Sequence, residues 1–195
     1  MSSNSAYVFD LGGVVCRFEP ERRLAALARV TGRSPAAVDD AIWKSDVSRR
    51  CDLGDLDVDD IVALVREEIG FAGTYEELAH LWSLAFVPDD AVLGVVDRVR
   101  QNAPTALLTN NPPMVHDALP VALPAVARAF DRLFFSYALG ACKPDAQVFA
   151  RVTDALGCDA GAITFVDDSA PNVAAAAAAG WHALLFDQRT DLDDL

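Results

Sequence analysis

The chain has 195 residues, of which 52% are hydrophobic, and its 29 acidic and 16 basic residues give a formal net charge of −13. This length suits one domain with a small insertion and a well-buried core, and the apolar stretches are too short to span a bilayer. The acidic balance argues against nucleic acid or an anionic membrane as a partner, because both bind to basic faces.

The first predicted strand, residues 6–9, follows a polar stretch that lacks the basic and apolar regions of a signal peptide. We therefore expect a cytoplasmic protein. The strand is short, apolar and rich in β-formers, and Asp10 follows it directly, ahead of Gly12 and Gly13. Sites in open α/β sheets lie at strand ends, and glycines let main-chain groups approach a ligand closely. Asp10 is therefore a candidate nucleophile or cation ligand, although a strand with an Asp-capped glycine turn fits the same residues.

Four consecutive helical patterns follow the first strand and continue to about Val87. Each begins with a proline or a capping residue, and two of them end at a glycine. The residues expected to open these helices are Pro20, Ser34, Asp57 and Thr74. Helices in this position predict an inserted cap over residues 18–87, with a core formed by residues 1–17 and 88–195.

From residue 88 onward, helical and strand patterns alternate, as they do in a parallel sheet wrapped by helices. The expected helices cover residues 89–101, 145–156 and 171–179, and the expected strands end at Thr109 or cover residues 133–136, 163–166 and 182–186. The sequence therefore predicts an α/β fold, with a Rossmann-like, doubly wound parallel sheet and an inserted α-helical cap.

Three more groups of reactive residues accompany Asp10. Two of them end apolar runs that read as strands, and the third precedes a helical pattern. Neutral donors, an ammonium group and paired acids suit phosphate binding and metal binding. The residues are Thr109 with Asn110, Lys143, and Asp167 with Asp168.

In these four groups and their spacing, the sequence resembles the haloacid dehalogenase-like (HAD) hydrolase superfamily over residues 7–186. The resemblance implies a magnesium-dependent phosphatase of small phosphorylated metabolites. In such an enzyme Asp10 would attack phosphorus, and water would then hydrolyse the aspartyl-phosphate. Thr109, Asn110 and Lys143 would contact the transferring phosphoryl group and offset its charge. The expected partner is a small phosphate ester.

The resemblance also implies which residues would hold Mg²⁺, an ion that prefers oxygen ligands. These would be Asp10, Asp168 and the backbone carbonyl of Gly12, with Asp167 either coordinating the ion or acting from behind the ligands. Asn172 is a candidate to orient the loop that carries the two acids, although an ordinary helix residue needs no such role. A turn capped by an acid fits Asp167 and Asp168 equally well when they are taken alone.

The sequence departs from the family's commonest pattern at Gly12. Phosphatases of this superfamily typically carry an aspartate there, which serves as general acid and then as general base. Loss of this general acid and base costs roughly 10²–10⁴ in rate. Part of the family nevertheless has a similar sequence at this motif and includes phosphatases of small sugar phosphates. Four residues are candidates to replace it: Asp46, Asp52, Asp55 and His116.

Two other functions fit parts of the pattern. A 2-haloacid dehalogenase shares Asp10 and Lys143, but the resemblance gives it uncharged residues in place of Asp167 and Asp168. It also gives dehalogenases an aromatic residue in place of Gly12. The second alternative is a phosphate- or partner-binding protein that lost turnover together with the acid. The sequence leaves the substrate and the oligomeric state open.

Overall fold

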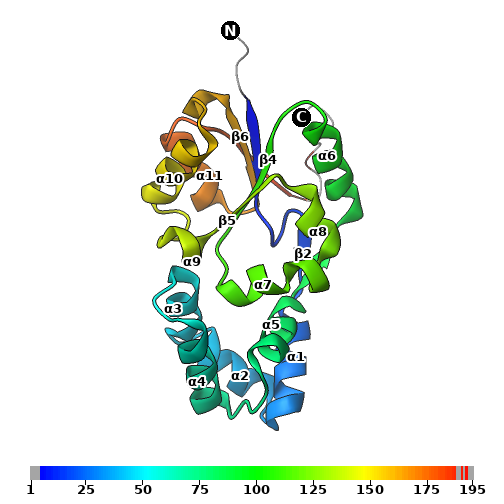
Figure 1. Cartoon of the computed structure of the whole chain (residues 1–195), viewed down its shortest axis with the longest axis vertical. Coiled ribbons are helices and arrows are strands. Elements are labelled where there is room, and N and C mark those ends of the chain that lie inside the picture. Colours follow the sequence, from blue (N-terminus) through cyan, green and yellow to red (C-terminus); the bar gives the residue numbers. More distant parts are fainter. Residues whose placement is uncertain (1–4, 188–189, 191, 193–195) are drawn as a thin grey trace.

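Five parallel strands form the sheet at the centre of the α/β part of the molecule (Figure 1). The computed structural model describes residues 5–187, 190 and 192 of the chain. The strands lie in the order β5-β4-β1-β6-β7, and each neighbouring pair is parallel. Their bounds are Ala6–Phe9 for β1, Thr105–Thr109 for β4, Arg132–Phe135 for β5, Ile163–Asp167 for β6 and His182–Leu185 for β7.

Helices cover both faces of this sheet, with α10 and α11 on one side and α6 and α8 on the other (Figure 1). Their bounds are α6 (Asp90–Arg100), α7 (Pro113–Ala122), α8 (Pro124–Ala129), α9 (Ser136–Leu139), α10 (Ala146–Leu156) and α11 (Ala170–Ala178), with a 3₁₀ turn, η1, at Ala160–Ala162. Val8 packs into the apolar cluster under α10 and α11, whereas its neighbour Phe9 packs into the cluster on the opposite face. This alternation is typical of a parallel sheet buried on both faces. The predicted Rossmann-like, doubly wound α/β fold is confirmed.

Five helices gather at the other end of the molecule (Figure 1). They are α1 (Pro20–Thr31), α2 (Pro35–Ile42), α3 (Val47–Leu53), α4 (Val58–Ile69) and α5 (Tyr75–Ser83). Ser34, Asp57 and Thr74 cap α2, α4 and α5 as predicted, each by accepting a backbone N–H bond. The prediction of four helices was wrong, because α3 has seven residues and no side-chain cap to mark its start.

A short antiparallel ribbon joins these helices to the sheet, and it was not predicted. It pairs β2 (Cys16–Phe18) with β3 (Phe86–Pro88), so that Phe18 lies opposite Phe86. Strands of three residues are too short to show a two-residue period in the sequence. The expected boundary between core and cap falls within this ribbon, and we keep residues 18–87 as a proposed cap.

Three helices between β4 and α10 were also missed. Prolines open α7 and α8, and Pro120 lies inside α7, so the sequence reads there as turns rather than as helices. Helix α7 packs against α5 and thereby connects the sheet part to the group of five helices.

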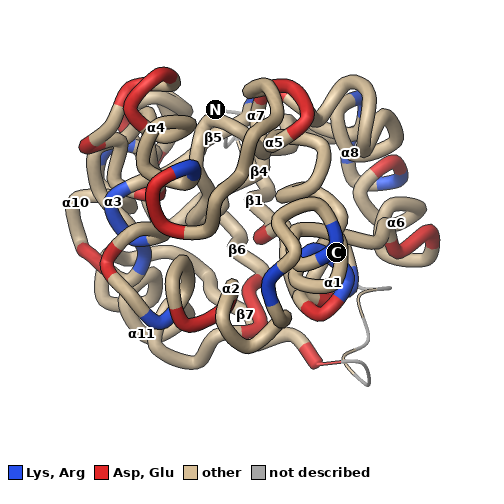
Figure 2. Tube along the Cα trace, turned by 90° about the horizontal axis from the view of Figure 1, so that it is seen from below, with Lys and Arg blue, Asp and Glu red and all other residues tan. Residues whose placement is uncertain are grey.

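Acidic residues are spread over many helices instead of gathering on one face (Figure 2). Within the described residues, every helix is too short or too polar to cross a bilayer. The cytoplasmic location stays a prediction.

Candidate active site

The polar groups predicted from strand ends meet at the carboxyl edge of the sheet. Asp10 follows β1 and Asp167 ends β6, and these strands are paired so that Phe9 lies beside Val166. Thr109 ends β4, the neighbour of β1 on its other side. Parallel strands deliver their carboxyl ends to one edge, which explains why residues far apart in the sequence converge.

Lys143 lies at the centre of this edge, with a side chain that is 1% exposed. Its Nζ is 2.8 Å from Oδ1 of Asp10 and 2.7 Å from Oδ2 of Asp167, and it donates a third bond to the carbonyl of Leu108 at 2.9 Å. These three acceptors fix the ammonium group and match its three donors.

The side chain of Asn110 holds the backbone of Lys143 through two hydrogen bonds. Asn110 Nδ2 donates to the Lys143 carbonyl, and the Lys143 N–H donates to Asn110 Oδ1, both at 2.8 Å. The sequence predicted that Asn110 contacts the phosphate. The two hydrogen bonds show that its side chain also positions Lys143. Its predicted phosphate contact stays a prediction.

Three carboxylates face the single ammonium group. One oxygen from each of Asp10, Asp167 and Asp168 lies within 4.8 Å of the others. Burial raises the pKa of Asp10 to about 6, with Lys143 opposing this shift and Asp167 adding to it. Burial, followed by the charge of Asp167, also raises the pKa of Asp168. Such crowding of like charges is the condition that a bound divalent cation relieves.

Asp167 is the most firmly held member of this acidic cluster. It is fully buried and accepts bonds from the Ser169 N–H at 2.8 Å and from Asn172 Nδ2 at 3.0 and 3.1 Å. Together with Lys143, these donors leave Asp167 little freedom to move. Asn172 therefore orients the acidic loop, as the sequence suggested.

The two glycines after Asp10 have different surroundings. Gly13 has a φ of +88°, and a Cβ atom placed there would lie 2.1 Å from Oδ2 of Asp168. Gly12 lies outside the left-handed region, and its Cβ would meet the rings of Phe86 at 3.2 Å and Phe18 at 3.4 Å. Gly13 thus makes room for an acid, while Gly12 faces an aromatic pair.

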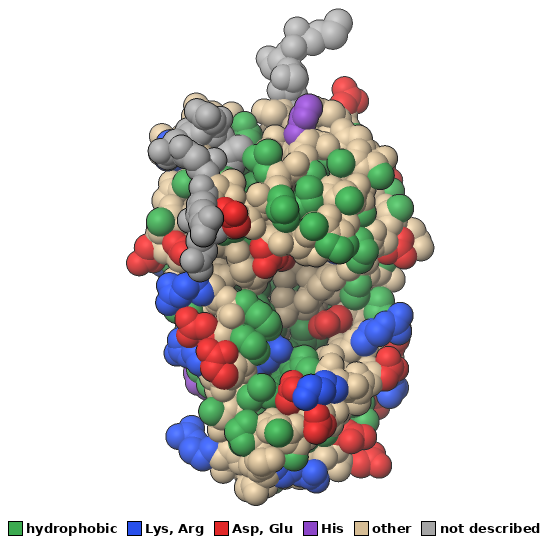
Figure 3. All heavy atoms as spheres, turned by 180° about the vertical axis from the view of Figure 1, so that it is seen from behind, with side chains coloured by type: hydrophobic (Ala, Val, Ile, Leu, Met, Phe, Trp, Pro, Cys, Tyr) green, Lys and Arg blue, Asp and Glu red, His purple; other side chains and the backbone are tan. Residues whose placement is uncertain are grey.

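A cavity of about 250 Å³ opens above Asp10, between the sheet and the five helices. The space-filling view shows a hollow between these two parts (Figure 3). Thr109 is buried in its wall, and its Oγ1 accepts a bond from Asn111 Nδ2 at 2.7 Å, which leaves the hydroxyl proton free to donate. The sheet side of the wall includes Asp10, Gly12, Thr109, Asn110, Lys143 and Asn172.

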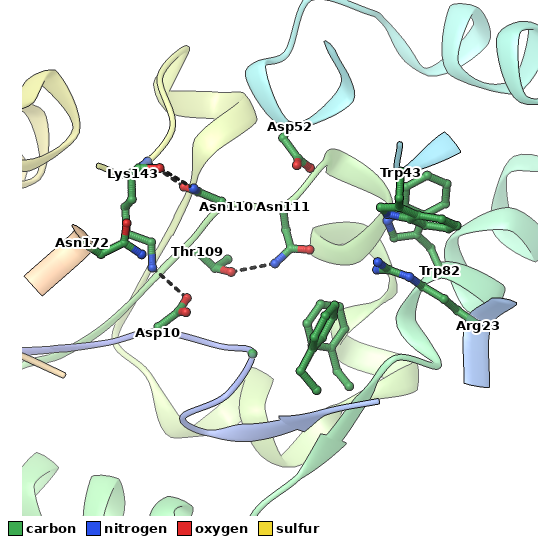
Figure 4. Close-up of a pocket in the computed structure, with 13 residues that line it drawn as sticks. Asp10, Arg23, Trp43, Asp52, Trp82, Thr109, Asn110, Asn111, Lys143 and Asn172 are labelled. Carbon is green, nitrogen blue, oxygen red and sulfur yellow. Dashed lines mark hydrogen bonds and ion pairs between the residues drawn. The ribbon is translucent and has the colours of Figure 1, made fainter. Parts of the chain in front are cut away.

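The opposite wall carries residues from the helices and the ribbon. Figure 4 shows Arg23, Trp43, Trp82 and Asp52 across the cavity from Asp10. Sequence reasoning missed Arg23 and the two tryptophans. The available signal was a charged residue one turn before Leu27, on the buried face of α1.

Of the four residues considered as a replacement acid, Asp52 lines the cavity. Burial raises its pKa to about 7, and the charge of Arg23 opposes that shift. Asp46 lies 3.8 Å from Arg49 in an exposed ion pair. The other two also have different surroundings: Asp55 is exposed, and the ring of His116 stacks on Phe135 and bonds to the hydroxyl of Tyr137 at 2.8 Å.

Residues 5–180 match the family model of haloacid dehalogenase-like hydrolases. The chain belongs to this family. It is 29% identical over 202 residues to phosphatase MT3486 of Mycobacterium tuberculosis (strain CDC 1551 / Oshkosh), a match that covers 95% of this chain and 88% of the relative.

Solved HAD structures share the fold. HAD family enzyme BT-2542 of Bacteroides thetaiotaomicron, in complex with magnesium and inorganic phosphate, superposes with a TM-score of 0.80 at 20% identity, covering 97% of this chain and 98% of that one. The L-2-haloacid dehalogenase of Xanthobacter autotrophicus gives a TM-score of 0.65 at 18% identity, covering 94% and 79%. Both similarities show that the fold is shared.

Proposed function

We propose that this HAD-like hydrolase is a magnesium-dependent phosphatase of small phosphorylated metabolites, with Asp10 as its nucleophile. The observation that carries the proposal is the position of Asp10, beside two further acids and a buried lysine, at the floor of a small cavity. The name of the mycobacterial relative and the magnesium and phosphate bound to BT-2542 support it.

The residues of the acidic cluster fit Mg²⁺, because three carboxylates face one ammonium group and Gly13 leaves space for Asp168. Asp10 and Asp168 would hold the ion, together with the carbonyl of Gly12, while Asp167 would act mainly through its bonds to Lys143 and Asn172. A bound Mg²⁺ supplies positive charge that lowers the repulsion between Asp10 and the substrate phosphate.

In the first step, a carboxylate oxygen of Asp10 forms a bond to phosphorus as the ester P–O bond breaks and the alcohol leaves. In the second, water attacks the aspartyl-phosphate and releases inorganic phosphate. The hydroxyl of Thr109 and the ammonium group of Lys143 would stabilise the charge on the phosphoryl oxygens. The ion pair with Lys143 also keeps Asp10 ionised against its burial.

Asp52 is our candidate for the proton transfers that Gly12 cannot perform. Its carboxyl group points toward the cavity (Figure 4). A pKa of about 7 suits an acid that works near neutral pH. Protonated Asp52 would donate to the departing alcohol oxygen, and the resulting carboxylate would accept a proton from the attacking water.

The dehalogenase alternative fits this site less well. A haloacid dehalogenase needs no metal, yet here Asp167 and Asp168 crowd the nucleophile with negative charge. Gly12 also lacks the aromatic side chain expected of that activity. The binding-protein alternative would require that Asp52 cannot transfer protons.

Product release assays separate these three functions. Phosphate release from p-nitrophenyl phosphate should depend on added Mg²⁺ and disappear with EDTA. Chloride release from 2-chloropropionate without a metal would instead identify a dehalogenase. Phosphate binding by calorimetry without release of either product would identify a binding protein.

A further inference from the structure

Arg23 is a charged residue buried in the wall of the active-site cavity. It extends from α1 and is 6% exposed. Its guanidinium carbon lies 4.0 Å from the ring centre of Trp43, 5.2 Å from that of Phe18 and 5.9 Å from that of Trp82. Aromatic rings that also line the cavity therefore lie around the group (Figure 4).

This guanidinium lacks an anionic partner in the part of the chain that the structure describes. Its Nε–H has no hydrogen-bond acceptor, and no described carboxylate lies within 4.0 Å of it. Asp52 and Asp39 act on it from farther away, and its pKa, lowered by burial to about 10, keeps it charged at neutral pH. Buried charges are normally paired, because removing them from water is costly.

The stacking geometry leaves the donors of Arg23 available. Rings contact the flat faces of a guanidinium, whereas its N–H groups lie in the plane and form a fork that fits carboxylate or phosphate oxygens. Figure 4 shows this edge turned toward Asn111 and the cavity. The aromatic side chains also exclude water, which strengthens an ion pair formed there.

The position of Arg23 in the cavity indicates which end of a substrate it would contact. Asp10 and Lys143 line the opposite wall of the same cavity of about 250 Å³. A phosphate placed over Asp10 would leave space for only a small alcohol group, whose far end would reach the wall formed by α1.

We propose that Arg23 binds a second anionic group, a carboxylate or a phosphate, on the leaving-group end of the substrate. The preferred substrates are then small phosphate esters with a negative group at each end. This inference rests on the proposed phosphatase function and adds the chemical class of its substrate. The overall charge of −13 would repel such molecules, so a preference for them has to arise locally.

Three esters with the same three-carbon chain test the inference: propyl phosphate, 3-(phosphonooxy)propanoate and propane-1,3-diyl bisphosphate. With Mg²⁺ present, we expect kcat/KM for at least one charged ester to exceed that for propyl phosphate by about 30-fold or more. This is the lower end of the effect of a buried charge pair. The better of the two charged esters identifies the anion.

Variants assign the preference to Arg23. Arg23→Gln should bring the ratio of charged to uncharged ester close to one, and Arg23→Lys should keep part of it. Arg22→Gln is the matched control, because Arg22 directly precedes Arg23 in α1 but pairs with Glu19 at the surface. That control should keep the wild-type ratio. Thermal unfolding of each variant checks the fold.

Equal kcat/KM values for the three esters in the wild type would overturn the inference, and this result needs no variant. A uniform loss of activity toward all three in Arg23→Gln would also overturn it, because a purely structural role predicts that result. Hydrolysis of p-nitrophenyl phosphate in the same preparation separates the two proposals. If that ester is cleaved with Mg²⁺, the phosphatase function stands whatever the preference.

Discussion

The two walls of the cavity are built in different ways. On the sheet side, Lys143, Asp167 and Asn172 are buried and joined by hydrogen bonds that satisfy nearly every polar atom. On the helix side, Arg23 lies among aromatic rings without an anionic partner, and no hydrogen bond to the Asp52 carboxyl group occurs among the described residues. A preorganised wall, whose polar groups are already fixed by hydrogen bonds, suits catalysis. A wall whose polar groups still lack partners suits recognition of a ligand.

The largest effect should follow a change at the centre of the preorganised wall. Asp10→Asn keeps the size of the side chain but removes the nucleophile, so kcat for p-nitrophenyl phosphate should fall by about 10³-fold or more. The thermal midpoint should stay near that of the wild type, because the change also removes repulsion with Asp167. Asp59→Asn, an exposed acid on α4, is the control. Retention of wild-type turnover would exclude Asp10 as nucleophile.

The difference between the walls also explains what the sequence could predict. Asp10, Thr109 and Asp167 follow apolar runs, and sheet topology brings such strand ends together whatever their distance along the chain. Arg23 lies on α1 and Trp43 directly follows α2, so their contact depends on how α1 packs against α2. No local pattern encodes that packing.

Other misses have local causes. The ribbon of β2 and β3 is formed by strands of three residues, which cannot show a period. The two adjacent glycines look equivalent in the sequence, and only the backbone geometry shows that Gly13 alone has a positive φ. The fold was thus predicted well, the sheet wall of the site largely, and the helix wall only through Asp52.

A smaller effect is expected from the proton-transfer group on the helix wall. Asp52→Asn should slow hydrolysis of propyl phosphate by about 10²-fold or more and that of p-nitrophenyl phosphate much less, because the nitrophenolate needs no proton to leave. Burial raises the pKa of Asp52 to about 7. The acid form is therefore lost as pH rises through 7, and wild-type kcat for propyl phosphate should fall there.

The pH profiles of kcat for both esters provide the measurement. The fall near pH 7 should be absent in Asp52→Asn. Because the folded-state pKa of Asp52 lies above the ordinary value for aspartate, its ionisation lowers the stability of the wild type as pH rises from about 4 to about 7. The loss of stability over this range should be smaller in the Asn variant. An unchanged profile in the variant would assign the proton transfer to another group.

A third prediction concerns the metal ligands at the floor of the cavity. Gly13→Ala introduces a Cβ atom 2.1 Å from Oδ2 of Asp168 at a residue with positive φ, so Asp168 must move. We expect the Mg²⁺ concentration for half-maximal activity to rise by about 10- to 100-fold, the usual cost of disturbing a ligand's support. Gly12→Ala is the matched comparison and should cost less, since rings rather than an acid face it. Equal effects at both positions would contradict the inference that Gly13, and not Gly12, makes room for Asp168.

The smallest and most specific effect is a gain at Gly12. Gly12→Asp should accelerate hydrolysis of propyl phosphate by less than about 10-fold and leave that of p-nitrophenyl phosphate little faster, because only the alkoxide needs a proton. The gain is limited because the new side chain has to displace the rings of Phe18 and Phe86, which its Cβ would meet at 3.4 and 3.2 Å. The backbone itself imposes no left-handed strain at this position.

The same substitution in the Asp52→Asn background sharpens the comparison of the two walls. If a carboxyl group from either wall can serve the leaving group, Gly12→Asp should restore more activity toward propyl phosphate there than it adds to the wild type. The gains in kcat measured in the two backgrounds decide the matter. Equal gains would mean that Asp52 and the introduced acid act independently, and Asp52 would then not be the proton donor. A larger gain in the variant background would show that the helix wall supplies the acid that the sheet wall lacks.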